Sequence, residues 1–185
     1  MPQTLDGAKD SIARFFIEAK GCVEGEFGFS AMLTAFSVML GVSEAVYGNY
    51  GIASLIKWFF SQMNDKTSWL ILPTQVSAQN QNEIGKKLAD LRNGLAHEFS
   101  MPSDVLLAKN VQSAAEKKDH HLDKYIIAIN EFLDAVSRTV DGIVKSNPGA
   151  VLDANPRGVD RATGLRLEEG TGSTPLSGSS GTETH

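Results

Sequence analysis

The stretch LDKYIIAINEFLDAVSRTVDGIVKS, residues 122–146, carries a clear helical pattern. Its apolar side chains recur every three or four residues, which places them on one face of a helix of about six turns. The stripe consists of Tyr125, Ile129, Phe132, Val136, Val140 and Ile143. Burying such a side chain stabilises a fold by roughly 1.5 to 3 kcal/mol, so this helix is expected to pack against other elements.

Further helices are predicted from the same spacing, and they cover residues 6–20, 29–47, 52–63 and 79–99. Gly21 and Gly48 offer stops after the first two of them. The second is apolar most of the way round, which predicts a central position in the fold.

Two segments between these helices lack a clear period. Residues 64–75, NDKTSWLILPTQ, mix turn formers with an apolar patch and Pro73, and are interpreted as an irregular connection. Residues 103–120 fit either a short hairpin or a helix. Because no segment alternates long enough to force a sheet, the sequence predicts an all-α fold, an antiparallel helical bundle of four to five main helices.

The composition changes after Ser146, where Gly, Pro, Ser and Thr become frequent. Such a segment has too little apolar surface to offset the entropy lost on ordering. We therefore expect one helical domain over residues 1–146 and a disordered tail over residues 147–185.

Composition and charge exclude several classes of protein. The chain has 185 residues, 42% of them hydrophobic, which suits one domain with a sizeable core. A net charge of -5 argues against bulk nucleic-acid binding, so any such contact would be local. Cys22 is the single cysteine and the start MPQTLDGAKD lacks the order of a secretion signal, which predicts a cytoplasmic protein.

An uncharged run over residues 27–43 is long enough to raise the question of a membrane span. Ser, Thr and Gly residues dilute it, Glu26 and Glu44 bracket it, and no Lys/Arg cluster flanks it. A buried core helix is the preferred interpretation, and no membrane partner is expected. Trp58 and Trp69 are likewise interpreted as core residues, and His120 and His121 as part of a solvated loop.

The segment LADLRNGLAHEFS, residues 88–100, places polar residues on an otherwise amphipathic helix. On a regular α-helix Asn93 and His97 point outward, about 40° apart, on the same stripe as Lys86 and Asp90. Arg92 lies about 140° from His97, beside the apolar seam. A straight helix would therefore keep the two apart, unless the arginine wraps around or a second copy of the chain supplies the partner group.

The other residues of this segment also shape the prediction. Gly94 lacks a side chain and would permit close approach of another backbone. Leu88, Leu91, Leu95 and Phe99 form the apolar face.

The residue types suit one kind of chemistry. Histidine titrates near neutral pH and moves protons, as the cleavage of RNA by its own 2′-hydroxyl requires. Arginine offers a forked cationic donor for a phosphate oxygen, and asparagine can orient the histidine. The plain alternative is a solvated helix face.

Arg92, Asn93 and His97 in LRNGLAHEF resemble the R-x(4–6)-H signature of HEPN domains, often written RNxxxH. The resemblance implies a helical bundle that commonly dimerises so that two motifs meet in a cleft. It also implies a metal-independent endoribonuclease without a cofactor, of the kind found in toxin–antitoxin, phage-defence and RNA-processing systems. Arg92 and His97 would be catalytic with Asn93 supporting, the substrate would be RNA, and an antitoxin or regulatory protein is a possible partner. The family also contains non-catalytic dimerisation or binding modules, which is the alternative function.

Other residues bear on this assignment. Glu44 lies at the end of an apolar helix and is a candidate accessory group together with Asp90 and Lys86; the alternative for Glu44 is a solvent-facing position. Phe99 occupies the position at which one HEPN subtype has a tyrosine modified with AMP, so that modification is excluded here. With Lys86, Lys87 and Arg92 as the nearby cations, RNA binding should depend only weakly on salt.

Overall fold

The computed structural model describes residues 3–77, 80–98 and 100–152 of the chain. Its α-helices are α1 (Leu5–Glu24), α2 (Gly28–Tyr47), α3 (Ile52–Gln62), α4 (Gln81–Asn93), α5 (Val111–Lys118) and α6 (Ile129–Ser146). A π-helix, η1 (Gly94–Glu98), continues α4. Short strands are β1 (Gln3–Thr4), β2 (Leu70–Ile71), β3 (Val105–Ala108), β4 (Tyr125–Ala128) and β5 (Val151–Leu152).

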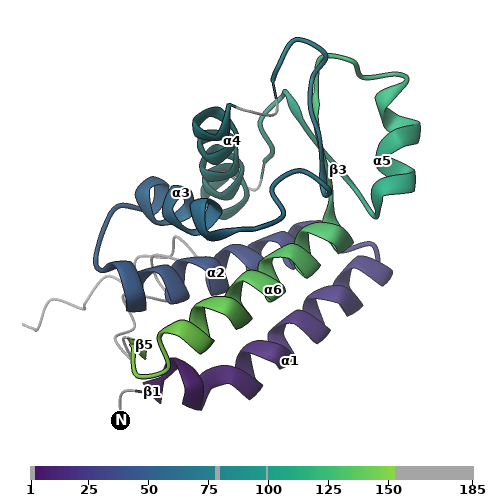
Figure 1. Ribbon diagram of the computed structural model, residues 1–185. Coiled ribbons are helices and arrows are strands. Elements are labelled where there is room, and N and C mark those ends of the chain that lie inside the picture. Colours follow the sequence, from purple (N-terminus) through teal and green to yellow (C-terminus); the bar gives the residue numbers. More distant parts are fainter. Residues whose placement is uncertain (1–2, 78–79, 99, 153–185) are drawn as a thin grey trace, which may run out of the picture.

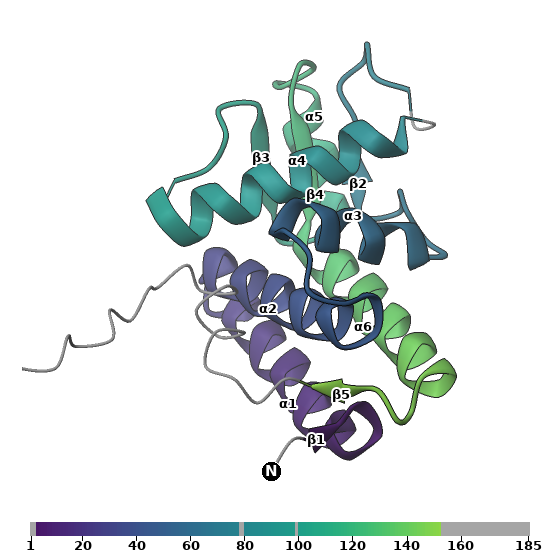
Figure 2. The same cartoon turned by 90° about the vertical axis from the view of Figure 1, so that its left-hand side faces the viewer.

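The helices form two layers (Figure 1). Helices α1, α2 and α6 lie side by side in one layer, and α3 and α4 lie over α2 in the other. The small sheet of β2, β3 and β4 lies with α5 at one end of the second layer (Figure 2). The fold is therefore mainly helical, as predicted, and it also contains small sheets that the all-α assignment did not include.

Helix α2 is the central element of the core. It packs against α1, α3 and α6, and its side chains Met32, Phe36 and Met39 are completely buried. Within the described part of the chain, α2 alone is long and apolar enough to cross a membrane by length and composition, and 44% of its most apolar window is buried inside the fold. Its packing among three other helices supports the interpretation as a core helix.

Helix α1 is longer than predicted. It begins at an N-cap in which the Thr4 hydroxyl accepts a hydrogen bond from the Gly7 amide, at 3.2 Å. It then runs through Gly21, the expected stop, and ends at Gly25. A glycine inside a helix costs about 1 kcal/mol, and the burial of Val23 in the next turn offsets that cost.

Residues 125–128 correct the predicted last helix. They form β4, the central strand of the three-stranded sheet, and α6 begins only at Ile129. β4 pairs with β2 in antiparallel and with β3 in parallel orientation. All four of its residues are buried, and a short apolar run of this kind fits a buried strand as well as a helix. The periodicity was therefore ambiguous at this point.

The segment 103–120, left open between a hairpin and a helix, contains one strand and one helix. β3 leads into α5, whose N-cap Asn110 accepts a hydrogen bond from the Ser113 amide at 2.9 Å. α5 in turn leads to β4, so β3, α5 and β4 form a parallel strand–helix–strand unit. The connection over residues 64–75 also contributes a strand, β2.

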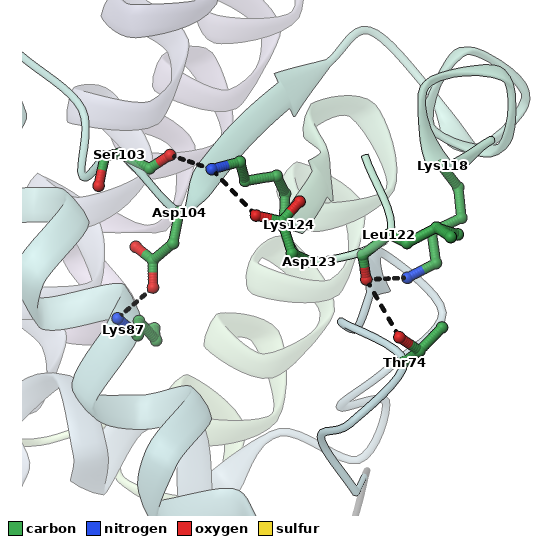
Figure 3. A network of polar contacts seen from close by, with 8 residues as sticks. All are labelled: Thr74, Lys87, Ser103, Asp104, Lys118, Leu122, Asp123 and Lys124. Atoms are coloured by element: carbon green, nitrogen blue, oxygen red, sulfur yellow. Dashed lines mark hydrogen bonds and ion pairs between the residues drawn. The ribbon is translucent and has the colours of Figure 1, made fainter. Parts of the chain in front are cut away.

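Lysine side chains tie this unit to its surroundings (Figure 3). The Lys87 ammonium on α4 lies 2.5 Å from the Asp104 carboxylate, just before β3. Lys124 donates to the Ser103 carbonyl at 2.9 Å, and Lys118 donates to the Leu122 carbonyl at 3.3 Å. These contacts hold α4 and the strand ends in a fixed relation, although the sheet itself is small.

The folded part of the chain extends beyond Ser146. β5 pairs with β1 in antiparallel orientation, and the Leu5 amide donates to the Ala150 carbonyl at 2.8 Å. The structure places residues up to Leu152, past the predicted boundary at residue 146, against β1 and against α2 near Gly41. The rest of the predicted tail, residues 153–185, lies outside the described residues.

Candidate functional site

Helix α4 carries the motif and is fixed on both sides. Its N-cap Asn80 accepts a hydrogen bond from the Glu83 amide at 3.3 Å. The predicted apolar face is buried, with Leu88, Leu91 and Leu95 at 2% exposure or less. On the α3 side, a Cβ at Gly85 would lie 3.1 Å from Lys57 Cγ, so the glycine permits close packing of the two helices.

The last turn of the motif is a π-helix instead of an α-helix. η1 spans Gly94–Glu98, and the chain then folds back so that the Ser100 amide donates to the Gly94 carbonyl at 3.1 Å. A Cβ at Gly94 would lie only 2.8 Å from the Ser100 carbonyl oxygen. The expected close approach of a backbone to Gly94 is therefore confirmed, and the approaching backbone belongs to the same chain.

The π-helix brings Arg92 and His97 together. Nη1 of Arg92 lies 3.3 Å from Nε2 of His97 and donates to Oδ1 of Asn93 at 3.2 Å. The expectation that one helix keeps the arginine and the histidine apart is wrong, because it assumed α-helical geometry. In a π-helix the hydrogen bonds join residues five apart. The side chains of residues 92 and 97 therefore lie close together on one face of the helix.

The three side chains differ in their exposure. Arg92 is completely buried, whereas Asn93 and His97 are exposed, as predicted. Burial lowers the pKa of the Arg92 guanidinium, because the charged form loses hydration. Arginine has no hydrogen-bond acceptor, so in this contact Nη1 donates and Nε2 of His97 accepts. A neutral His97 then carries its proton on Nδ1.

An open pocket of about 650 Å³ adjoins the two exposed residues of the motif. One wall consists of Asn93, His97 and Glu98, and the other of Gly51 and the first turn of α3. No side chain caps this end of α3. The first amide groups of a helix lack partners within it and attract anions, so the pocket places an imidazole opposite a helix end that suits a phosphate.

The candidate accessory residues lie at different places. Lys86 is exposed on α4, one turn before Asp90, which is half-buried and whose carbonyl accepts from the Gly94 amide. Glu44 is half-buried in the last turn of α2, a helix that contacts both α4 and η1. Lys87 is paired with Asp104, so its expected phosphate contact is not supported. Phe99 lies outside the described residues.

The sequence analysis missed the α3 wall of the pocket, residues 51–54. The available signal was the predicted helix start at residue 52, preceded by a glycine without a capping side chain. Nothing in the spacing of the motif indicated that this helix end would face His97. The role expected for Arg92 is also affected, because a completely buried guanidinium contacts no phosphate from solution in this conformation.

No protein-family model matches the chain, and no curated protein or solved structure matches it either. The functional assignment therefore depends on the geometry of the site and on the resemblance of the motif.

Proposed function

We propose that this protein is a metal-independent endoribonuclease of the HEPN type, built on a helical domain and acting in the cytoplasm. The observation that carries the proposal is the convergence of Arg92 and Asn93, at the end of α4, with His97 of the π-helix beside an open pocket. π-Helical turns inside α-helices are rare and are frequent at functional sites. A solvated helix face would require neither the buried arginine nor the π-helix.

The geometry supports a division of roles in RNA cleavage. The 2′-hydroxyl attacks the adjacent phosphorus, a bond from the 2′ oxygen to phosphorus forms, and the bond to the 5′ oxygen breaks. His97 takes the proton of the 2′-hydroxyl on Nε2, which leaves its contact with Nη1 of Arg92, and passes it to the leaving 5′ oxygen, so that the 2′,3′-cyclic phosphate and a free 5′-hydroxyl are formed. The first amide groups of α3 bind the phosphate opposite His97. Arg92 acts as a positioning residue, since it contacts His97 and Asn93 from the buried side.

The proposal includes a homodimer and a role as a toxin or phage-defence effector held in check by an antitoxin or another regulatory protein. These features rest on the resemblance of LRNGLAHEF to the family signature. The geometric argument for a second copy is now weaker, because Arg92 and His97 meet within one chain. A test is to mix Arg92→Ala and His97→Ala chains: restored cleavage supports a shared site, and its absence restricts each site to one chain.

The direct test of the proposed activity uses purified protein and a mixed-sequence RNA in the presence of EDTA. We expect the wild-type protein to cut the RNA, and His97→Ala to cut it on the order of 10²- to 10⁴-fold more slowly, the range of a lost proton-transfer group. His120→Ala is the matched control, because His120 is an exposed histidine in the turn after α5. Equal cleavage by wild type and His97→Ala, or none by either, contradicts the proposal.

A second function is favoured by one observation. The complete burial of Arg92 and its contact with the His97 ring also suit a non-catalytic HEPN-like module, in which the motif stabilises a surface for dimerisation or binding. In that case no RNA is cut, and Arg92→Ala alters the oligomeric state or partner binding. Measuring cleavage and oligomeric state on the same variants separates the two functions.

A further inference from the structure

Three aromatic rings form a continuous stack between the end of α2 and α3, the helix that provides one wall of the pocket. The ring centroids of Tyr47 and Tyr50 are 4.6 Å apart with 30° between the ring planes. Those of Tyr47 and Trp58 are 5.4 Å apart with 15° between the planes. Tyr47 ends α2, Tyr50 lies in the following loop, and Trp58 lies on α3. Two helices and their connection therefore contribute to one nearly parallel aromatic array, the Tyr47–Tyr50–Trp58 stack.

This stack is unlike the aromatic packing of the core. Trp69 is completely buried and meets Phe60 and Phe132 edge to face. In the stack, by contrast, Tyr47 is 43% exposed and Tyr50 is 52% exposed. Tyr47 stacks with both neighbouring rings and Trp58 packs against the core, so Tyr50 at the end of the stack is the most exposed of the three rings. The stack therefore buries a smaller part of its aromatic surface than the rings of the core do.

A tight turn fixes the backbone at Tyr50, the residue before the pocket lining begins. Gly48 has φ +108°, a conformation that residues with a side chain rarely adopt, and the Tyr50 amide donates to its carbonyl at 3.0 Å. A Cβ at Gly48 would lie 3.6 Å from the Tyr50 ring. Gly51, the next residue, already lines the pocket opposite His97. The tight turn therefore fixes the backbone at Tyr50, which directly precedes Gly51, the first residue of the pocket wall on the α3 side.

We propose that the Tyr47–Tyr50–Trp58 stack is a binding site for an unpaired nucleobase, next to the phosphate that the pocket receives. That the base belongs to RNA rests on the proposed function. Bases stack on aromatic side chains in proteins that bind single strands, because each base has a π-face. Bases inside a duplex are stacked already and do not reach such a surface.

The test measures binding separately from cleavage. The probe is a fluorescein-labelled single-stranded 2′-O-methyl RNA, which lacks the attacking hydroxyl, and its fluorescence anisotropy gives Kd at fixed salt. We expect Tyr50→Ala to raise Kd roughly 5- to 100-fold, the range for loss of one stacked base, and Tyr50→Phe to bind like the wild type. Phe15→Ala is the control, because Phe15 is an aromatic side chain of similar exposure on α1, outside the pocket. A blunt duplex of the same sequence should bind more weakly than the single strand.

Several outcomes overturn the base-binding site. These are an unchanged Kd for Tyr50→Ala, equal effects of Tyr50→Ala and Phe15→Ala, equal affinity for duplex and single strand, or a changed oligomeric state of Tyr50→Ala in sedimentation. Cleavage keeps this test distinct from the proposed function. If the wild type cuts RNA but Tyr50→Ala binds the single-stranded probe with an unchanged Kd, the result supports the nuclease and contradicts the base-binding site. If the wild type cuts no RNA but Tyr50→Ala binds the single-stranded probe more weakly, the result supports the base-binding site and contradicts the nuclease.

Discussion

Helices α4 and α6 both turn one apolar face toward the core, but their C-terminal turns differ. α6 stays α-helical from Ile129 to Ser146 and buries aliphatic and aromatic side chains along its length. α4 changes to a π-helix at Gly94 and buries the guanidinium of Arg92 instead. The comparison indicates that regular hydrogen bonding is kept where the helix serves packing alone. It is given up where polar side chains five residues apart are brought together.

The largest effect is expected when a methyl group is added to a glycine in each helix. In α6 nothing lies within 4 Å of a Cβ at Gly142, so Gly142→Ala should stabilise the protein by up to about 1 kcal/mol through helix propensity. In the motif, Gly94→Ala places its Cβ against the Ser100 carbonyl and should destabilise the protein by about 1 to 3 kcal/mol. Denaturant unfolding of the two variants measures both changes.

The same pair of variants reports on the site. Gly94→Ala should disrupt the contact between Arg92 and His97, which is visible as a changed ring-nitrogen signal of His97 in NMR spectra, whereas Gly142→Ala should leave that signal in place. A stable Gly94→Ala protein with an unchanged His97 signal would remove the distinction between the two helices.

A smaller effect is expected at the bond between α4 and the strand that precedes α6. The Tyr125 hydroxyl donates to the Glu83 carboxylate at 2.5 Å, and Tyr125 is buried whereas Glu83 is half-buried. Tyr125→Phe removes this bond and should destabilise the protein by about 1 to 2 kcal/mol, somewhat below the usual range for a hydrogen bond to a charged group because Asn80 still donates to Glu83. Thermal or urea unfolding at pH 7 measures the difference.

The pH dependence of that difference has a defined sign. Burial, and then the contact with Glu83, raise the pKa of Tyr125 above its ordinary value of 10.0. The neutral hydroxyl is thus favoured in the folded state, and its contribution is complete below about pH 10 and is lost as the pH rises further. The gap between wild type and Tyr125→Phe should narrow above pH 10. A gap that is constant from pH 7 to 11 would contradict the assigned bond.

The smallest effect is expected at the exposed attachment of α6. Asp65 lies 3.3 Å from Arg138 on α6 and accepts a hydrogen bond from the Ser68 amide at 3.0 Å. Hydrogen bonding from the Ser68 side chain lowers the pKa of Asp65 below its ordinary value of 3.8. Asp65→Asn should cost about 0.5 kcal/mol at pH 7, because the pair is partly exposed and solvent screens it.

This contribution has the opposite pH dependence to that of Tyr125. A depressed carboxyl pKa stabilises the folded state above about pH 4, and the effect is lost as the pH falls through the folded-state value. Wild type and Asp65→Asn should therefore converge in stability near pH 2. Unfolding curves at pH 2, 4 and 7 measure this, and a difference that grows toward low pH would count against the interpretation.

The parts of the fold that follow a single period could be predicted from the sequence. The predicted ranges 29–47 and 52–63 differ from α2 and α3 by one residue at one end each. Strand β4 escaped prediction because YIIA is too short to distinguish a buried strand from the start of a helix, and its partners β2 and β3 come from segments without a period. Those partners are determined by tertiary contacts.

The site was predictable in its residues but not in its geometry. The motif singled out Arg92, Asn93 and His97, and the wheel placed the last two outward as the structure does. The wheel also placed Arg92 beside the apolar seam, where the structure buries it. It failed for the separation of Arg92 from His97, because it fixes 100° per residue and the change to a π-helix depends on the chain folding back over Gly94. The wall from α3 and the aromatic stack required the packing of three helices, which no local spacing contains.

The pairing of β1 with β5 places Gln3 opposite Leu152, at the end of the molecule away from α4 (Figure 2). Paired residues of antiparallel strands have Cα atoms about 5 Å apart, so a short linker would close residues 3–152 into a ring. The ring could be opened in the exposed turn at His120 without cutting α3, α4 or the loop between α2 and α3. The site therefore does not depend on the order in which the elements follow one another along the chain. A circular permutant opened in this turn should keep the pocket intact.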